Sequence, residues 1–596
     1  MCSLSVINMD HKNHDGDNNN TDDIDPGKKG LWEPIKYHFR YLPVHVALLH
    51  TGKVLAFGGS GNDETRLNSP YPAPDDLERS DVDHRDNHVH SHNHHTTSNR
   101  EKNSNSYSNN GNINSNINGK GSASTNHQAG RVYEIPTDVS GDIFCSGHAF
   151  LSDGRLIVAG GTYKYDGKFL QFPIPPFSGL QHTHIFDPIT LKWSQVDDMK
   201  NGRWYPSCIM LADGRILVMA GLSKNFPWAF LKELEIYSSK DREGWQTIPG
   251  ADHWIPMYPR LHLLPSGEIF YAGSYKTHYT FPFSLYGFPS STFNIQNRRW
   301  RKVGNPHNVK REEGTTVLLP LLPPDYTAKV LLIAGGTQPG TDAINDVEMI
   351  DFSEKHPKYK SIKPLKHPRY YAYAVLLPDQ SVLVLGGKIG TKGHTHTQTH
   401  TQMNSNKSIH KQKKLEMIRH EALEEVPHDH HAVLEPELFN PKDNNWHPMA
   451  SMKLDRLYHA NALLLPDGRV MTAGSNPERR INELRIELYR PPYLFRGRRP
   501  KISKSPNSIT YGQEFEIQTN DNANHINAIA LIRPSVTTHC VNTEQRYIGL
   551  EFLVKNSNIL SAKTPLNRNI LPPGYYMLFV VTEDNIPSFG YFVHVS

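Results

Sequence analysis

One pattern recurs along the chain: a short apolar strand that follows a turn and ends in small residues, usually glycine. It occurs seven times, as VLAFGGS (54–60), LIVAGGT (156–162), ILVMAGL (216–222), IFYAGS (269–274), VLLIAGGT (330–337), VLVLGGK (382–388) and VMTAGSN (470–476). Several intervals fall near fifty to sixty residues. Paired glycines after a β-branched strand at this period are typical of kelch-type propeller blades. We therefore predict an all-β fold with a seven-bladed propeller, and the alternative is a stack of unrelated β-hairpins.

Three of the repeats contain an Asp-Gly pair between apolar runs, at 151–156, 211–216 and 465–470. Such a pair predicts a two-residue hairpin turn with positive φ at both positions. Equal distance from equivalent turns implies equivalent places in each repeat. The residues eight positions before these turns are Cys145, Tyr205 and His459, and Tyr458 immediately precedes the last of them.

Two further tyrosines, Tyr258 and Tyr371, stand in the same register. We expect them to line the axial channel of the propeller. Two interpretations stay open for them, contact with a substrate and structural packing of the channel.

Two intervals between repeats are too long for one blade, and their composition explains them. Residues 62–130 and 390–432 are rich in His, Asn, Ser or Thr and contain few apolar residues. Such tracts bury too little apolar surface to offset the entropy of ordering, so we predict disordered insertions, and a disordered tail over 1–30. The clustered histidines could bind copper or zinc weakly, but biased low-complexity sequence explains them without a ligand.

The pattern changes near residue 485, after the seventh repeat. Short alternating strands separated by Pro and Gly turns fill 485–596 and predict a small immunoglobulin-like β-sandwich. The predicted domains are thus a propeller over 31–484 and this sandwich. The basic cluster at 496–501 lies in the connection between them, and a net charge of +4 over 596 residues gives no sign of a nucleic-acid partner.

Bulk properties exclude several other classes. No segment approaches eighteen consecutive apolar residues, so we expect no membrane span. The first thirty residues lack the basic start and apolar core of a secretory signal, which leaves the compartment unknown. The four cysteines are too few for a disulfide scaffold, although a Cys208–Cys540 disulfide stays open.

Several segments together resemble the copper-radical oxidases, the group of glyoxal oxidase and galactose oxidase. They are DIFCSGHAFLSDGRL, GRWYPSCIMLADGRI, YPRLHLLPSGEI, RLYHANALLLPDGRV, THCVNTEQR and PPGYYMLFV. The resemblance covers about 32–596 apart from the two insertions. It implies one mononuclear copper on the propeller axis, reached by a loop from the C-terminal sandwich. Members of this group usually work outside the cell.

The resemblance also implies a role for each of five residues. Tyr205 matches the equatorial tyrosinate that carries the protein radical, and Cys145 the cysteine joined to its ring by a thioether. Tyr458 and His459 match the axial tyrosine and the first histidine ligand. His539 matches the second histidine ligand, supplied by the sandwich.

These residue types suit a two-electron oxidation that uses one copper ion. Copper cycling between Cu(II) and Cu(I) supplies one oxidising equivalent, and a radical on Tyr205 the other. Two imidazoles and two phenolates suit Cu(II) and leave a position for substrate. Tyr458 then acts as the general base toward the substrate hydroxyl. We expect a monomer that oxidises a small aldehyde or primary alcohol and reduces O2 to H2O2; the alternative is a non-catalytic kelch scaffold with a vestigial copper site.

Strand geometry gives two expectations about this site. Side chains alternate faces along a strand, so Cys208, three positions after Tyr205, should point away from its ring, which leaves Cys145 as the better partner. The same rule requires Tyr458 and His459 to lie outside a regular strand if both reach copper. By spacing, Ser223 replaces a tryptophan that galactose oxidase-like members stack over the cross-linked ring. Trp204 resembles a feature of glyoxal oxidase-like members, and Trp228 is a candidate to fill part of that space.

Overall fold

The computed structural model describes most of the repeats and the whole C-terminal region. The described residues are 3–8, 25–58, 132–135, 139–164, 178–224, 230–239, 244–273, 288–309, 311–336, 343–390, 429, 431–476 and 482–596. The predicted insertions at 62–130 and 390–432 lie almost wholly outside them, and so does Trp228.

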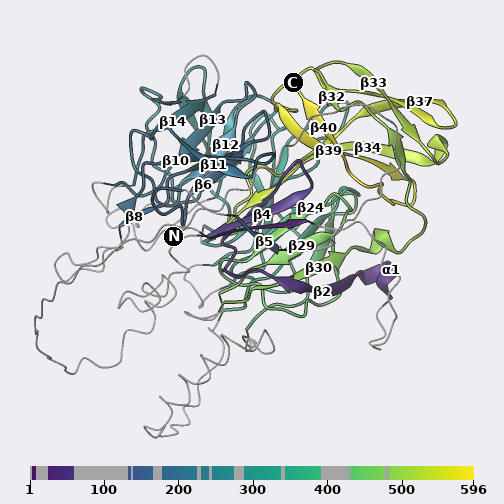
Figure 1. The fold of residues 1–596 in the computed structure, drawn as a ribbon, viewed down its shortest axis with the longest axis horizontal. Coiled ribbons are helices and arrows are strands. Elements are labelled where there is room, and N and C mark those ends of the chain that lie inside the picture. Colours follow the sequence, from purple (N-terminus) through teal and green to yellow (C-terminus); the bar gives the residue numbers. More distant parts are fainter. Residues whose placement is uncertain are drawn as a thin grey trace, which may run out of the picture.

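The repeats form antiparallel sheets (Figure 1). In each sheet, the apolar strand that follows the turn pairs with a neighbouring strand on both sides. Five of these sheets, each given from its innermost strand outward, are β6 (Gly147–Phe150), β7 (Leu156–Ala159), β10 (Thr183–Asp187) and β11 (Lys192–Val196); β12 (Ser207–Met210), β13 (Ile216–Met219), β14 (Glu235–Ser238) and β15 (Gly244–Thr247); β16 (Arg260–Leu263), β17 (Ile269–Ala272), β18 (Ser290–Asn294) and β19 (Arg299–Gly304); β20 (Thr315–Leu318), β21 (Lys329–Ile333), β22 (Val347–Asp351) and β23 (Tyr359–Ile362); and β24 (Tyr373–Leu376), β25 (Val382–Leu385), β26 (Glu437–Asn440) and β27 (Asn445–Pro448).

Two further sheets combine segments that are distant in the sequence. One contains β28 (Asn461–Leu464), β29 (Val470–Ala473), β30 (Arg485–Arg490) and β2 (Leu31–His38); the other contains β35 (Val536–Thr537), β3 (His45–Leu48), β4 (Lys53–Gly58), β1 (Ser3–Asn8) and β5 (Val132–Glu134). A small two-stranded sheet pairs β8 (Thr162–Lys164) with β9 (Ser178–Gly179).

The innermost strands contact one another in the order β6, β12, β16, β20, β24, β28 and β3, and β35 lies between β3 and β6. This order closes a ring. The all-β class is thereby confirmed. The count of seven blades stays a prediction, since parts of the chain between the sheets lie outside the described residues.

The ring is closed by pairing early and late parts of the chain. Strand β2 runs antiparallel to β30, with Trp32 opposite Tyr489. The two rings stack with centroids 4.8 Å apart, and the Trp32 indole N–H donates to the carbonyl of Ala450 at 2.8 Å. Strand β30 therefore belongs to the propeller, and the predicted boundary at 484/485 is wrong by one strand.

The predicted disordered tail over 1–30 is also partly wrong. Residues Ser3–Asn8 form β1, which pairs with both β4 and β5, and Pro26–Lys29 form the short helix α1. The composition of this segment does not favour an ordered structure, but pairing with the strands of a sheet stabilises one.

The Asp-Gly turns differ from the expected two-residue type. Gly154 has a positive φ of 87°, whereas Asp153 is not among the residues with positive φ. Leu151 and Arg155 close the hairpin around three loop residues, and the Asp153 carboxylate accepts from the backbone N–H of Arg155 at 3.0 Å. With a third residue in the loop, only the glycine must be left-handed.

The C-terminal strands form two facing sheets, drawn in yellow and yellow-green in Figure 1. One contains β31 (Ile502–Lys504), β33 (Glu514–Thr519), β38 (Ile559–Lys563) and β37 (Glu551–Asn556); the other contains β32 (Ser508–Ile509), β40 (Tyr591–Val595), β39 (Gly574–Thr582), β34 (Ile526–Arg533) and β36 (Arg546–Gly549). Ile517 and Leu560 of the first sheet share a core with Leu531 and Leu578 of the second. Two 3-10 helices, Pro492–Leu494 and Ala523–His525, complete the described elements.

The connection from β34 to β36 leaves the sandwich and enters the propeller. We call residues 534–545 the axial hairpin. Its strand β35 pairs with β3, and the Thr537 hydroxyl donates to the Asn461 side chain at 2.8 Å. The Thr543 hydroxyl donates to the carbonyl of Cys208 at 2.7 Å. The axial hairpin thus contacts three different sheets of the ring.

Among the described residues, no helix has the length and apolar character needed to cross a bilayer.

Candidate metal centre

Six residues of the ring share an unusual backbone conformation. Each lies two positions before an innermost strand and has a positive φ; they are Cys145 (63°), Tyr205 (60°), Tyr258 (43°), Glu313 (50°), Tyr371 (67°) and His459 (59°). A left-handed backbone at a non-glycine residue costs roughly 1–2 kcal/mol, and such strain gathers at functional sites. Six sheets of the ring thus have one strained position each, and five of these six residues, all except Glu313, are in the register predicted from the turns.

Backbone hydrogen bonds join several of these positions across neighbouring sheets. Tyr205 N–H donates to the carbonyl of Cys145 at 3.0 Å, and Tyr258 N–H donates to the carbonyl of Tyr205 at 2.8 Å. The same bond links Tyr371 to Glu313 at 3.0 Å. These positions therefore form an axial ring, which brings together side chains from separate repeats.

The geometric requirement on Tyr458 and His459 is met. Strand β28 begins only at Asn461, and His459 is left-handed, so the alternation of a regular strand does not apply to the pair. The centroids of the two side-chain rings lie 3.8 Å apart.

His539 stands at the tip of the axial hairpin. Thr538 and Val541 pair across the turn, and both residues between them, His539 (46°) and Cys540 (62°), have positive φ. These are the φ signs of a type I′ turn, which usually contains Asn-Gly. Contacts with the propeller therefore hold a turn that the local sequence disfavours.

The five candidate residues converge on the axis. The hydroxyls of Tyr205 and Tyr458 are 2.6 Å apart, and the rings of His459 and His539 lie 4.6 Å apart at 85°. The Cys145 sulfur lies 3.9 Å from Nε2 of His539, and Cys145 packs in the same buried cluster as Tyr205.

Each of the two histidines has a ring nitrogen whose lone pair is available to bind a metal. Thr538 donates its hydroxyl hydrogen to the carbonyl of Val44 at 2.9 Å, so at 2.6 Å it accepts from Nδ1–H of His539. That bond leaves Nε2 of His539 as the lone-pair nitrogen. Both ring nitrogens of His459 are buried and have no hydrogen-bond partner among the described residues. Burial lowers the pKa of His459 to about 3 and the pKa of His539 well below its ordinary value, so both rings are neutral at pH 7.

Two neutral imidazoles and two phenols are donors that fit Cu(II). Among the described residues, no three His, Cys, Asp or Glu side chains are grouped so as to hold a metal ion. A metal on the axis would therefore need the phenol oxygens of Tyr205 and Tyr458 besides the two histidines. Burial raises the pKa of Tyr205 well above its ordinary value, an effect reinforced by Cys145 and Tyr458. A phenol so placed ionises only with a cation beside it.

Aromatic rings cover both faces of Tyr205. Trp204 stacks on it at 3.9 Å between centroids and an interplanar angle of 8°, and Tyr258 stacks at 4.5 Å and 27°. Two rings this close to one centroid would overlap each other on a single face, so they occupy opposite faces. Trp204, the immediate sequence neighbour of Tyr205, therefore supplies the stacking tryptophan where Ser223 had been expected to leave a gap.

The other cysteines and tyrosines are placed as follows. Cys145, Cys208 and Cys540 are free and buried, so the Cys208–Cys540 disulfide is not formed. Cys208 packs in a different apolar cluster from Tyr205, whereas Cys145 shares the cluster of Tyr205. Tyr371 lies 5.1 Å from the ring of Tyr458.

A set of anchoring arginines was missed at the level of sequence. Arg203, Arg311 and Arg369 each stand two positions before an axial residue, and Arg456 stands three before His459. Each guanidinium binds the carbonyl that follows the second strand of its own sheet; these carbonyls belong to Ala220, Ala334, Gly386 and Gly474.

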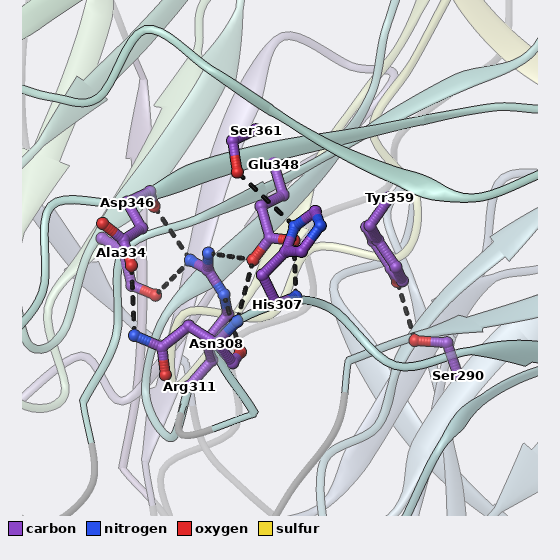
Figure 2. Close-up of polar contacts among 9 residues, drawn as sticks. All are labelled: Ser290, His307, Asn308, Arg311, Ala334, Asp346, Glu348, Tyr359 and Ser361. Atoms are coloured by element: carbon purple, nitrogen blue, oxygen red, sulfur yellow. Dashed lines mark hydrogen bonds and ion pairs between the residues drawn. The ribbon is translucent and has the colours of Figure 1, made fainter.

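A buried glutamate on the third strand completes each of these anchors. Figure 2 shows Arg311, whose guanidinium donates to Glu348 at 2.6 Å and to the carbonyl of Asp346 at 2.8 Å. Arg203 pairs with Glu235 at 2.8 Å in the sheet that carries Tyr205. The signal was visible in the sequence as an arginine that recurs just before the axial register.

Comparison with known proteins is consistent with this geometry. Residues 499–595 match the family described as galactose oxidase-like, Early set domain. The chain is 26% identical to "Aldehyde oxidase GLOX" of Vitis pseudoreticulata over 77% of its own length and 83% of the relative. It is 24% identical to galactose oxidase of Gibberella zeae over 76% of its own length, but it spans only 61% of that relative.

A solved structure of a fungal alcohol oxidase in complex with copper is also similar, with a TM-score of 0.67 at 20% identity, covering 96% of this chain and 100% of the other. At this identity the likeness concerns the fold. The sequence relatives and the matched C-terminal domain show that the chain is similar to the copper-radical oxidases, the group of glyoxal oxidase and galactose oxidase.

Proposed function

We propose that the chain couples the two-electron oxidation of a small aldehyde or primary alcohol to the reduction of O2 to H2O2. The observation that carries the proposal is the meeting of two phenol oxygens, 2.6 Å apart, with two neutral histidines and one thiol. The names of the relatives, which include aldehyde, galactose and alcohol oxidases, support this range of substrates.

Tyr205, Tyr458, His459 and His539 are the residues that would hold copper. Bound copper supplies one oxidising equivalent, as Cu(II) going to Cu(I), and polarises the substrate oxygen. The other equivalent resides on Tyr205 as a ring radical. A thioether to Cys145 delocalises this radical, and the stacked rings of Trp204 and Tyr258 exclude water from both of its faces.

The two tyrosines divide the hydrogen transfers. Tyr458 takes the proton of the substrate hydroxyl, and the oxygen of Tyr205 takes the hydrogen atom from the adjacent carbon. A primary alcohol thereby becomes an aldehyde, and a hydrated aldehyde becomes a carboxylic acid. Each loses two protons and two electrons, which together convert O2 to H2O2. The hydroxyls of Tyr205 and Tyr458 lie 2.6 Å apart, so the two protons that O2 takes up are held side by side.

The thioether forms between two residues that share one buried apolar cluster. The S–H of Cys145 and one C–H of the Tyr205 ring are lost, a C–S bond forms, and O2 accepts the two electrons and two protons. We also propose that the chain acts as a monomer, because all five residues come from one chain. Its domains are then a propeller that ends with β30 and a sandwich that starts near residue 499.

Mass spectrometry and a peroxide assay test the proposal together. Protein loaded with copper in air should lose the mass of about two hydrogens and produce peroxide with methylglyoxal or a primary alcohol. Bound copper and a formed cross-link without peroxide across a broad substrate panel would instead favour a non-catalytic scaffold.

A further inference from the structure

Tyr373 lies beside the centre but belongs to none of the roles described above. It is the first residue of β24, is 5% exposed, and stands two positions after Tyr371 of the axial ring. Its hydroxyl donates to the carbonyl of Leu457 at 2.6 Å and accepts from the N–H of Ala460 at 3.1 Å. These two backbone groups flank Tyr458 and His459, so a single hydroxyl spans the segment that carries both.

The same hydroxyl also reaches the axial hairpin. The thiol of Cys540, the residue after His539, lies near it. The carbonyl of Cys540 accepts a hydrogen bond from the Thr315 hydroxyl at 3.2 Å.

The two histidines depend on their backbones to different degrees. His539 is oriented through its ring, because Nδ1 is hydrogen-bonded to Thr538 at 2.6 Å. His459 has no hydrogen bond at either ring nitrogen among the described residues, and its backbone is left-handed, with a φ of 59°. The direction of the His459 ring is therefore set mainly by the segment that Tyr373 spans.

We propose that Tyr373 is a positioning residue that fixes the two histidine-bearing turns relative to each other through its hydroxyl. The proposal rests on the proposed copper site. Residues that orient metal ligands from behind typically contribute about 10–100-fold to metal affinity.

The test is Tyr373→Phe, which removes only the hydroxyl. We expect the affinity for Cu(II), measured by competition with a chelator, to fall about 10–100-fold. The Cu(II) electron paramagnetic resonance spectrum should change as well, because a displaced histidine alters the ligand field. Neither readout requires turnover.

Tyr493→Phe is the matched control. The Tyr493 hydroxyl is also buried and donates to the carbonyl of Gly468 at 2.5 Å, at the far end of the β28–β29 hairpin that begins after His459. It should lose comparable thermal stability and keep the copper affinity and spectrum of the unchanged protein. If the two variants bind copper alike with the same spectrum, the proposal is wrong.

Two further results are distinguishable. If Tyr373→Phe does not fold, Thr315→Val removes the other support of Cys540, and it should also weaken copper binding; unchanged binding would overturn the proposal. If the unchanged protein binds no copper at the axis, the proposed function itself fails, and the role of Tyr373 fails with it.

Discussion

At the scale of single residues, the decisive question is which thiol meets the ring of Tyr205. Burial raises the pKa of Cys145 well above its ordinary value and the pKa of Cys208 to about 12, so both are protonated thiols at pH 7. Acidity therefore does not distinguish them. What distinguishes them is the neighbour, because Cys145 packs in the same buried cluster as Tyr205, whereas Cys208 packs in a different one.

This reasoning predicts the outcome of two serine substitutions. Cys145→Ser should abolish the mass loss on copper loading and leave copper bound, because the four proposed ligands remain. The radical should then need a stronger oxidant, and peroxide formation should fall by at least about tenfold, which corresponds to 1.4 kcal/mol in the barrier. Cys208→Ser, the control, should still form the cross-link. A mass loss that persists in Cys145→Ser would show that another residue is the partner.

At the scale of elements, four of the six strained axial residues are fixed by an arginine anchor of their own sheet. In the sheet of Tyr205 the anchor is Arg203, whose guanidinium binds Ala220 at 2.7 Å and Glu235 at 2.8 Å. Arg311 makes the equivalent contacts beside Glu313, in a sheet that contributes no proposed ligand (Figure 2). The two arginines make the same kinds of contact, but Arg203 supports the segment of Tyr205 and Arg311 supports the segment of Glu313.

Comparing the two anchors separates stability from function. Arg203→Met and Arg311→Met each leave a buried glutamate without its arginine partner, so each should lower the free energy of unfolding by about 3–5 kcal/mol in urea titrations. Only Arg203→Met should also reduce the fraction of protein that forms the thioether, because only it loosens the segment of Tyr205. Equal cross-link yields in the two folded variants would contradict this role.

The elements also show why the sequence predicted the site better than its support. Cys145, Tyr205 and His459 could be placed together because repeats carry equivalent residues at equal distances from their turns. The left-handed backbone at these positions could not be read from the residues, since cysteine, tyrosine and histidine all favour negative φ. The three-residue loops were missed because Asp-Gly fits both turn types, and the difference lies in one flanking residue.

At the scale of the whole molecule, the two bodies of the fold are joined by the axial hairpin and by buried polar groups around it. The sequence predicted both bodies but assigned β30 to the sandwich. The last strand of a closed ring is adjacent in sequence to the next domain, so its pattern does not show to which of the two it belongs. Long-range pairing with β2 decides the matter, and single-sequence patterns carry no information on such pairing. The role of Trp204 was missed for a similar reason: the spacing rule pointed to Ser223, and only the folded backbone turns the adjacent ring onto Tyr205.

The junction of the two bodies should make the protein sensitive to acid. His262 of β16 is 6% exposed, and its Nε2 lies 2.8 Å from the Thr316 hydroxyl. It lines a cavity of about 20 Å³ together with Arg533 and Arg546 of the C-terminal strands. Burial, aided by the charge of Arg546, lowers the pKa of His262 to about 3. The folded protein therefore keeps this imidazole neutral at pH values where the unfolded chain, with a pKa near 6.5, binds a proton.

Because the unfolded state binds more protons below pH 6.5, the free energy of unfolding falls as the pH falls, until the folded pKa is reached. Between pH 7 and 4.5, His262 alone should account for about 2–3 kcal/mol of this loss. Urea titrations of the metal-free protein at the two pH values measure it. His262→Gln should lose less stability on acidification than the unchanged protein by about that amount, whereas substitution of the exposed His525 by Gln should not alter the difference. An identical loss in His262→Gln would mean that the junction takes up the proton elsewhere, and the other buried histidines would then have to account for the whole acid sensitivity.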